Sequence, residues 1–255
     1  MDISSPENSR FKCWKSLLGR RGIKRYGKAL VSGSKIVLEL MRIHPEIVDG
    51  CLFSERNILP LSSFLSETQK YRLTSDLFRE LDVYGTGYPL LLVNIPAIHA
   101  FDPDSPHVGL SLLIPFQDPV NVGAVIRSAV AFGIRKIVLL KEAAHPYHPK
   151  SIRAGGTAVF LVSYSSGPSI HDIKQLPFPV VALSSDGIPV SRFTFPGTCA
   201  LLPGIEGPGL PGDITPDYMV SVPIDPEIES LNAAVAVSIV LYEYQRRYAC
   251  PNTMP

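Results

Sequence analysis

The stretch Gly109-Leu-Ser-Leu-Leu-Ile-Pro115 decides the fold class, and Gln117-Asp-Pro-Val-Asn-Val-Gly-Ala-Val-Ile-Arg-Ser-Ala-Val-Ala-Phe-Gly133 follows it closely. The first segment is a continuous apolar run, which is typical of a strand buried on both faces of a parallel sheet. The second has a turn at Asp118-Pro119, a candidate N-cap at Asn121 and a terminating glycine at Gly133, which predicts a helix over residues 122–132. A strand followed by a helix is the repeating unit of an α/β fold.

The rest of the C-terminal half continues this alternation. Helical stretches separate several further apolar runs. Strands are predicted at Lys136–Leu140, Ala158–Ser163, Pro179–Leu183, Thr198–Leu202 and Tyr218–Val222. Residues 108–255 are therefore expected to form a parallel sheet with helices on both faces.

The N-terminal region has a second, smaller α/β pattern. It predicts helices at Phe11–Leu18, Lys35–Ile43 and near Leu61–Glu67, and strands at Ala29–Val31, Ile47–Phe53 and Pro89–Val93. Prolines without any periodicity follow, which indicates a semi-rigid linker over residues 96–107. Two domains are thus predicted, 1–95 and 108–255.

The total charge hides a strong asymmetry. With 24 basic and 23 acidic residues the net charge is +1, which by itself argues against a nucleic-acid partner. Residues 1–35, however, hold nine basic and two acidic residues, a net charge of +7, while the remaining 220 residues carry −6. With Phe11, Trp14 and Tyr26 among the charges, this end suits a phosphate backbone with stacked bases. A merely solvated basic helix explains the same charges equally well.

Other features favour a cytoplasmic protein without metal or membrane contacts. The four cysteines show neither a CxxC pair nor a histidine at metal-ligand spacing, so they are expected to be reduced thiols. The longest apolar stretches are shorter than the ~20 residues that a membrane span needs. The N-terminus lacks the apolar core of a signal peptide.

Three loops that follow predicted strands carry candidate chemistry, because ligands bind at the carboxyl ends of parallel strands. In the first, Gly123 and Arg127 lie one turn apart on a helix. The second is the Gly- and Pro-rich segment 201–212, and the third places Ser230 and Asn232 before the apolar helix Ala233–Arg247. Each signal alone is weak. An ordinary amphipathic helix, a rigid turn, and a capped core helix or dimer interface are the simpler explanations.

Together the three loops resemble RNA methyltransferases of the SPOUT superfamily, TrmH (SpoU) type, over about 108–247. The first motif is Asn121-x-Gly123-x-x-x-Arg127, the second Gly204-x-Glu206-Gly-x-Gly-Leu210, and the third runs from Pro223 to Glu229-Ser-Leu-Asn232. The N-terminal block resembles, more loosely, the ribosomal-protein-like substrate-binding domain of that family.

The resemblance implies a deep trefoil knot in the C-terminal domain and a homodimer with a shared active site. It implies methyl transfer from S-adenosylmethionine to a ribose 2′-hydroxyl of ribosomal or transfer RNA. The implied catalytic residues are Asn121, Arg127, Glu206, Ser230 and Asn232. The implied cofactor-binding residues are Leu202, Gly204, Gly207, Val222, Ile224 and Leu231. The RNA-binding candidates are Arg20, Arg21, Lys24, Arg25, Lys150 and Arg153.

Three departures from the family pattern leave alternatives open. Ile205 stands where a polar or small residue is usual, Gly155 where Ser is common, and Ser32 where Glu is frequent. A catalytically silent SPOUT-fold RNA-binding protein is therefore one alternative. A Rossmann-type nucleotide enzyme is another, although the first loop lacks the glycine-rich turn of that class. Arg127 itself is either the base of the reaction or a cation that holds phosphate and stabilises the developing alkoxide.

Overall fold

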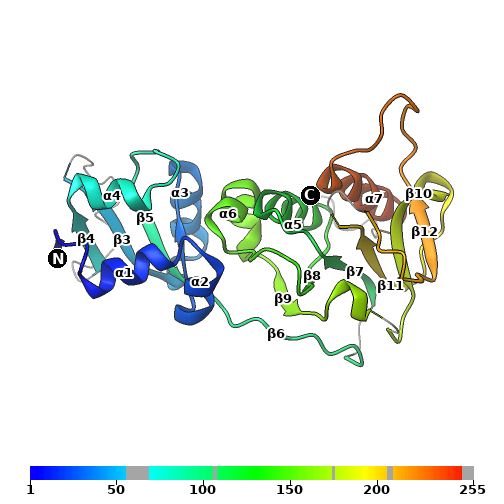
Figure 1. The fold of residues 1–255 in the computed structure, drawn as a ribbon, viewed down its shortest axis with the longest axis horizontal. Helices are drawn as coiled ribbons and strands as arrows, with labels where there is room; N and C mark the ends of the chain where they lie inside the picture. The colour runs from blue at the N-terminus through cyan, green and yellow to red at the C-terminus, as the bar shows by residue number, and fades with distance from the viewer. Residues whose placement is uncertain (56–68, 106–107, 174–175, 206–208, 249–255) are drawn as a thin grey trace. The chain divides into compact units, whose positions relative to one another are not determined.

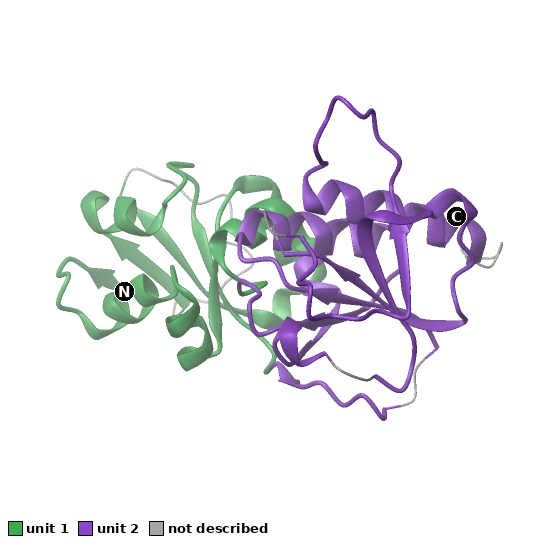
Figure 2. Ribbon diagram, turned by 45° about the vertical axis from the view of Figure 1, so that its right-hand side comes forward, with its two compact units in different colours: residues 1–97, 145–157 green, residues 98–144, 158–255 purple. Residues whose placement is uncertain are grey.

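The computed structural model describes residues 1–55, 69–105, 108–173, 176–205 and 209–248. The chain divides into two compact units (Figure 2). Unit 1 comprises residues 1–97 and 145–157, and unit 2 comprises residues 98–144 and 158–255. The helix predicted near Leu61–Glu67 lies outside the described residues.

Unit 1 is built on a mixed sheet (Figure 1). Its strands are β1 (Asp2–Ile3), β2 (Lys28–Val31), β3 (Val48–Ser54), β4 (Lys70–Leu73) and β5 (Leu90–Asn94). The order is β1-β4-β3-β5-β2, with β4 parallel to both of its neighbours and β5 antiparallel to both of its own. The helices are α1 (Ser9–Ser16), α2 (Arg20–Tyr26), α3 (Ser34–Ile43), η1 (Pro45–Ile47), α4 (Ser75–Leu81) and α6 (Pro149–Gly155).

The core of unit 1 corrects one reading of the basic N-terminus. Phe11 and Trp14 are buried, with 1% and 3% of their surface exposed, and they pack with the apolar side chains of α4 and of the sheet. They are therefore not available to stack on bases. Tyr26, at the end of α2, is exposed. The spacing of Phe11 and Trp14 along α1 marks its buried side, because residues three apart share one face of a helix.

The segment 145–157 belongs to unit 1 although it lies between two strands of unit 2 in sequence. Its helix α6 contacts β2, which is the last strand of the five-stranded sheet and therefore has one side free of strand partners. The hydroxyl of Ser151 donates to the carbonyl of His145 at 3.0 Å inside this segment. The domain bounds predicted from the sequence, 1–95 and 108–255 with a linker over 96–107, assign this segment to the C-terminal domain. These bounds stay a prediction.

Unit 2 confirms the predicted parallel sheet. Its strands are β6 (His99–Ala100), β7 (Gly109–Ile114), β8 (Lys136–Leu139), β9 (Ser163–Ser166), β10 (Val180–Pro189), β11 (Thr198–Pro203) and β12 (Tyr218–Ser221). They follow the order β12-β10-β11-β7-β8-β9-β6, and every described pair is parallel. The helical segments are α5 (Pro119–Ala131), η3 (Gly156–Phe160), η4 (Ile170–Asp172), η5 (Val190–Arg192) and α7 (Ala233–Tyr248).

Two local predictions were wrong. The segment predicted as the strand Ala158–Ser163 is mostly the 3-10 helix η3, and the strand begins only at Ser163, since Gly156 with φ +63° starts a tight turn. The segment predicted as a semi-rigid linker contains the short strand β6, which pairs with β9. Helix α5 begins at Pro119 and not at residue 122.

The expectation of helices on both faces of the unit 2 sheet was wrong for one face, which is covered mainly by irregular segments. Leu113, Val138, Val180, Ala200 and Leu202 form its buried cluster. The residues packed on this cluster are the partly buried Phe101, Ile173, Leu176, Ile205, Leu210 and Ile214. Helices α5 and α7 lie against each other elsewhere in the unit (Figure 1). In the described ranges, we find no helix with the length and apolar character of a membrane span.

A glycine holds α2 close to the end of α1. A Cβ atom at Gly22 would lie 2.1 Å from the carbonyl oxygen of Ser16, whereas one at Gly19 would lie 3.9 Å from the same atom. Alanine normally stabilises a helix interior by about 1 kcal/mol relative to glycine. We expect Gly22→Ala to lower stability instead, by roughly 1–3 kcal/mol, because the backbone must shift.

Thermal unfolding followed by circular dichroism measures this effect, and Gly19→Ala is the matched control. A Gly22→Ala protein as stable as the wild type would contradict the close packing of α2 on α1.

Candidate functional site

Helix α5 begins with an Asp-Pro pair. The side chain of Asp118 accepts a hydrogen bond from the Val120 amide at 2.9 Å, and Pro119 occupies the first helical position, where its fixed φ suits a helix start. Asn121, predicted as the N-cap, instead lies within the first turn. Gly133 follows the helix with φ +81°, as its predicted terminating role requires.

Asn232 caps α7 and joins it to α5. Its Oδ1 accepts hydrogen bonds from the amides of Ala234 at 3.0 Å and Val235 at 3.2 Å, and its Nδ2 donates to Oδ1 of Asn121 at 3.1 Å. The structure thus brings together one residue of the first motif and one of the third, 111 positions apart in sequence. The start of α5 and the start of α7 lie next to each other as a result.

Two more contacts continue this seam between the helices. The Oγ atoms of Ser128 and Ser238 are 2.7 Å apart, and the rings of Phe132 and Tyr242 meet edge to face with centroids 5.9 Å apart. From the first contact to the last, the residue numbers rise on both helices, so α5 and α7 run in the same direction. Sequence reasoning missed all four residues, because a serine or aromatic residue on an apolar helix does not indicate which distant helix it contacts.

Arg127 is exposed on α5. It directly precedes Ser128 and therefore projects about 100° around the helix from the seam. Within the described part of the chain, no carboxylate lies within 4.0 Å of its guanidinium and no hydrogen bond holds it. Its donors are free to meet an anion from outside the protein.

Backbone hydrogen bonds join Ile205 and Gly209 in the glycine-rich segment after β11. The amide of Ile205 donates to the carbonyl of Gly209 at 2.7 Å, and the reverse bond measures 2.9 Å. A Cβ atom at Gly204 would lie 2.5 Å from the backbone carbon of Gly209, so a side chain at position 204 would force this loop open. Glu206 and Gly207 lie outside the described residues.

The other candidate cofactor residues differ in accessibility. Leu202 is fully buried in the sheet, so only its backbone remains to contact a ligand. Val222 and Leu231 are half-buried, and Ile224 and Ser230 are exposed, all in the segment between β12 and α7. These residues, with Gly204, follow the carboxyl ends of β11 and β12, where a parallel sheet binds ligands.

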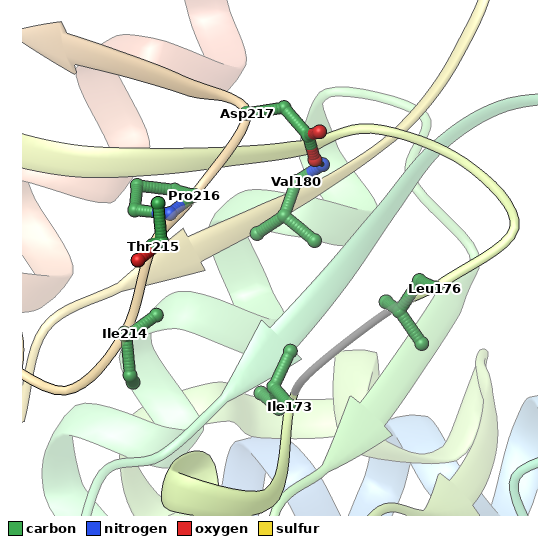
Figure 3. Close-up of a pocket in the computed structure, with 7 residues that line it drawn as sticks. All are labelled: Ile173, Leu176, Val180, Ile214, Thr215, Pro216 and Asp217. Carbon is green, nitrogen blue, oxygen red and sulfur yellow. Dashed lines mark hydrogen bonds between the residues drawn. The ribbon is translucent and has the colours of Figure 1, made fainter.

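A small cavity of about 90 Å³ lies at the amino-terminal ends of β10 and β12 (Figure 3). Asp217, one of its lining residues, accepts a hydrogen bond at 2.7 Å from the amide of Val180, the first residue of β10. Its lining residues are Ile173, Leu176, Val180, Ile214, Thr215, Pro216 and Asp217. None of the candidate site residues lines it, so this cavity is separate from the candidate site.

The candidate RNA-binding residues all fall in unit 1, on two exposed helix surfaces. Arg20, Arg21, Lys24 and Arg25 lie on α2, and Lys150 and Arg153 lie on α6. The guanidinium carbon of Arg25 is 5.4 Å from the ring centroid of Tyr26, and that of Arg153 is 5.2 Å from the ring of Tyr84. Among the described residues, no group of three or more His, Cys, Asp or Glu side chains is placed to hold a metal ion.

Comparison with known proteins decides the family. The model of the SpoU rRNA Methylase family matches residues 111–242, slightly more than half of the chain, and this range contains all of α5 and the first part of α7. The chain belongs to the SpoU rRNA methylase family.

Similar proteins cover most of the chain. The "Ribosomal RNA small subunit methyltransferase G 2" of Syntrophobacter fumaroxidans is 42% identical over 96% of this chain, which spans only 49% of that relative. The 23S rRNA (uridine(2479)-2′-O)-methyltransferase of Streptomyces viridochromogenes is 29% identical, over 94% of this chain and 90% of its own. The crystal structure of the SpoU methyltransferase AviRb from the same organism, in complex with AdoMet, has a TM-score of 0.78 at 28% identity and covers 94% of this chain and 98% of its own.

The two roles of Asn232 can be separated by mutation. Asn232→Asp keeps an oxygen that caps α7 but removes the donor to Asn121, whereas Asn232→Ala removes both. We expect Asn232→Ala to lower stability by about 1–2 kcal/mol, and Asn232→Asp to lower it by less.

Thermal unfolding checks this order, and Ser230→Ala, at an exposed position just before the cap, is the control that should leave stability unchanged. Equal losses for Asn232→Asp and Asn232→Ala would assign the whole effect to the contact with Asn121.

Proposed function

We propose that this protein transfers a methyl group from S-adenosylmethionine to a ribose 2′-hydroxyl of RNA, with ribosomal RNA as the favoured substrate class and transfer RNA as the second. The observation that carries the proposal is the hydrogen bond between Asn121 and Asn232, which joins the first and third motifs inside the segment matched by the SpoU family model. The similarity to a 23S rRNA 2′-O-methyltransferase and to an AdoMet-bound SpoU structure supports it.

The residues after β11 and β12 suit this cofactor. The backbone at Gly204 carries no side chain beside Gly209, and Val222 and Leu231 offer half-buried apolar surface. Backbone polar groups with an apolar lining are the usual environment of an adenosine-containing ligand. Leu202, Gly204, Gly207, Val222, Ile224 and Leu231 would hold it. When bound, S-adenosylmethionine supplies a methyl group already activated on a sulfonium.

The chain must then align the ribose hydroxyl and deal with its proton. Alignment alone lowers such a barrier strongly, because it removes the entropy cost of bringing the reactants together. We propose that Arg127 acts as a cation that holds a phosphate and stabilises the developing alkoxide, since a guanidinium is a poor base. Asn121, Glu206, Ser230 and Asn232 complete the proposed catalytic set.

Several finer features belong to the same proposal. They are the trefoil knot, a ribosomal-protein-like RNA-binding domain over residues 1–95, a linker over 96–107, and a cofactor-binding and catalytic domain over 108–255. The mixed α/β sheet of unit 1 and the exposed cations of α2 support the RNA-binding role. A cytoplasmic location follows from the proposed substrate.

The catalytic assignment is tested with labelled methyl transfer to ribosomal RNA and to transfer RNA from a strain that lacks the gene. We expect Arg127→Ala to lower turnover by about 100-fold or more while cofactor affinity, measured by calorimetry, stays within a fewfold. Lys136→Ala, which removes one exposed charge at the start of β8, is the control and should keep full activity. Unchanged turnover in Arg127→Ala would exclude the assignment, and absent cofactor binding in the wild type would favour the silent RNA-binding alternative.

A homodimer is proposed through α5 and α7. Val120, Val235 and Tyr242 on these helices are 45%, 48% and 50% exposed, so both helices carry apolar surface that a second copy of the chain would cover. Light scattering at micromolar concentration is expected to give twice the mass of the chain, and Val235→Glu is expected to give the single-chain mass. A monomeric wild type would contradict the shared active site.

A further inference from the structure

Some surface cations of unit 1 pair with carboxylates, and others do not. Among the described residues, Lys12 pairs with Glu7, Lys15 with Glu80, Lys28 with Asp49, Arg72 with Asp2 and Arg79 with Asp76. By contrast, Arg20 and Lys24 of α2 and Lys150 and Arg153 of α6 have no carboxylate within 4.0 Å among the described residues. The positive charge of α2 and α6 therefore remains uncompensated by the protein itself.

Contacts within unit 1 hold α6 in place beside the α1–α2 turn. The Nδ1 atom of His148 accepts a hydrogen bond from the amide of Lys150 at 3.2 Å, and its ring also interacts with the carbonyl of Leu18. Both α2 and α6 contact β2, the edge strand of the sheet. Cations that are 130 residues apart in sequence thus share one part of the unit.

The electrostatics of a buried histidine agree with this arrangement. His145 is 6% exposed, and burial together with the charges of Lys24 and Arg20 and with nearby His148 lowers its pKa to about 4. Burial and Arg20 also lower the pKa of Lys24. Because the groups that shift His145 electrostatically are all basic, the positive potential reaches the interior of the unit and the histidine stays neutral at pH 7.

Arg153 is held by a ring rather than by an acid. Its guanidinium lies over Tyr84, whose hydroxyl has no hydrogen-bond partner within the described part of the chain, so the contact is made by the ring. A Cβ atom at Gly33 would lie 3.1 Å from Nη1 of Arg153, so the guanidinium also lies close to the backbone of this glycine. A guanidinium fixed in this way keeps its donors for a bidentate contact with phosphate.

We propose that Arg20 and Lys24 of α2 together with Lys150 and Arg153 of α6 form one binding site for the phosphodiester backbone of an RNA strand, with Tyr84 as the residue that positions Arg153. The proposal rests on the proposed function only for the identity of the polyanion as RNA. RNA is favoured over an acidic protein because exposed Tyr26, at the end of α2, offers a base a stacking surface beside the cations. Residues 145–157 thereby take part in RNA binding although they lie inside the methyltransferase half of the sequence.

The test is the binding of a fluorescent 20-nucleotide single-stranded RNA to the full chain without cofactor, over a series of salt concentrations. Arg20→Ala, Lys24→Ala, Lys150→Ala and Arg153→Ala are each expected to lower affinity about three- to tenfold, and to reduce the slope of log K against log salt by about 0.7. The controls Lys12→Ala and Arg79→Ala remove the same charge from residues with carboxylate partners. They should leave affinity within about twofold.

Substitutions at Tyr84 separate positioning from charge. Tyr84→Phe keeps the ring and should bind RNA as the wild type does, whereas Tyr84→Leu should weaken binding nearly as much as Arg153→Ala. In the double variant, Tyr84→Leu should add little to the loss of affinity caused by Arg153→Ala, because both substitutions remove the same contact between the ring and the guanidinium. Arg153→Lys keeps the charge without the planar fork and should fall between the wild type and Arg153→Ala.

Two results would overturn the site. One is an equal loss of affinity in the control variants, and the other is polyglutamate competing with RNA at the same charge concentration. Circular dichroism of each variant shows whether it is folded, and Arg153→Lys, which keeps the charge, provides a conservative second test. Failure of methyl transfer with unchanged RNA binding would contradict the proposed function only, while unchanged salt slopes in an active enzyme would contradict this site only.

Discussion

The side-chain amide of Asn232 is the point on which the arrangement of unit 2 depends. Its oxygen caps α7 by accepting from two backbone amides, and its nitrogen donates across to Asn121 on α5. An Asn side chain supplies both an acceptor and a donor, whereas Asp lacks the donor and Ser has a single shorter group. One residue therefore fixes where α7 begins and which turn of α5 it meets. The Ser128–Ser238 and Phe132–Tyr242 contacts then keep the two helices in register.

Local signals predicted most of unit 2. The apolar runs of β7, β8, β11 and β12 were found within one residue of their observed limits, because buried strands of a parallel sheet need continuous apolar side chains. The start of β10 was also found, but this strand continues beyond its apolar run to Pro189. The cap of α5 was misplaced by three residues, since Asp118-Pro119 already provides both an acceptor and a fixed φ. Capping positions and the motif resemblance could identify Asn121 and Asn232 as candidates but could not pair them. Their contact depends on tertiary packing across 111 residues.

The charged N-terminus shows a similar limit. Composition located the excess of positive charge correctly, but it treated Phe11 and Trp14 as surface partners of those charges although both are buried. It also could not show that α6, far along the chain, packs in the same unit as α2. A sequence pattern records which residues are close along one helix, whereas the partner of a sheet edge such as β2 is decided by which remaining segment can cover it.

The two proposed anion-binding regions share one physical design. Arg127 in unit 2 and the cations of α2 and α6 in unit 1 are exposed and have no carboxylate partner among the described residues, while most ion pairs that do form lie elsewhere on unit 1. Exposed ion pairs contribute only about 0–1 kcal/mol each, so leaving these cations unpaired costs the folded state little. The same cations have no internal partner to release before they meet a phosphate. Non-ionic contacts, such as the ring of Tyr84 against Arg153, can orient them without neutralising their charge. A protein that must bind a polyanion strongly and release it after one reaction benefits from cations oriented in this way, because their attraction to phosphate is undiminished and remains sensitive to salt.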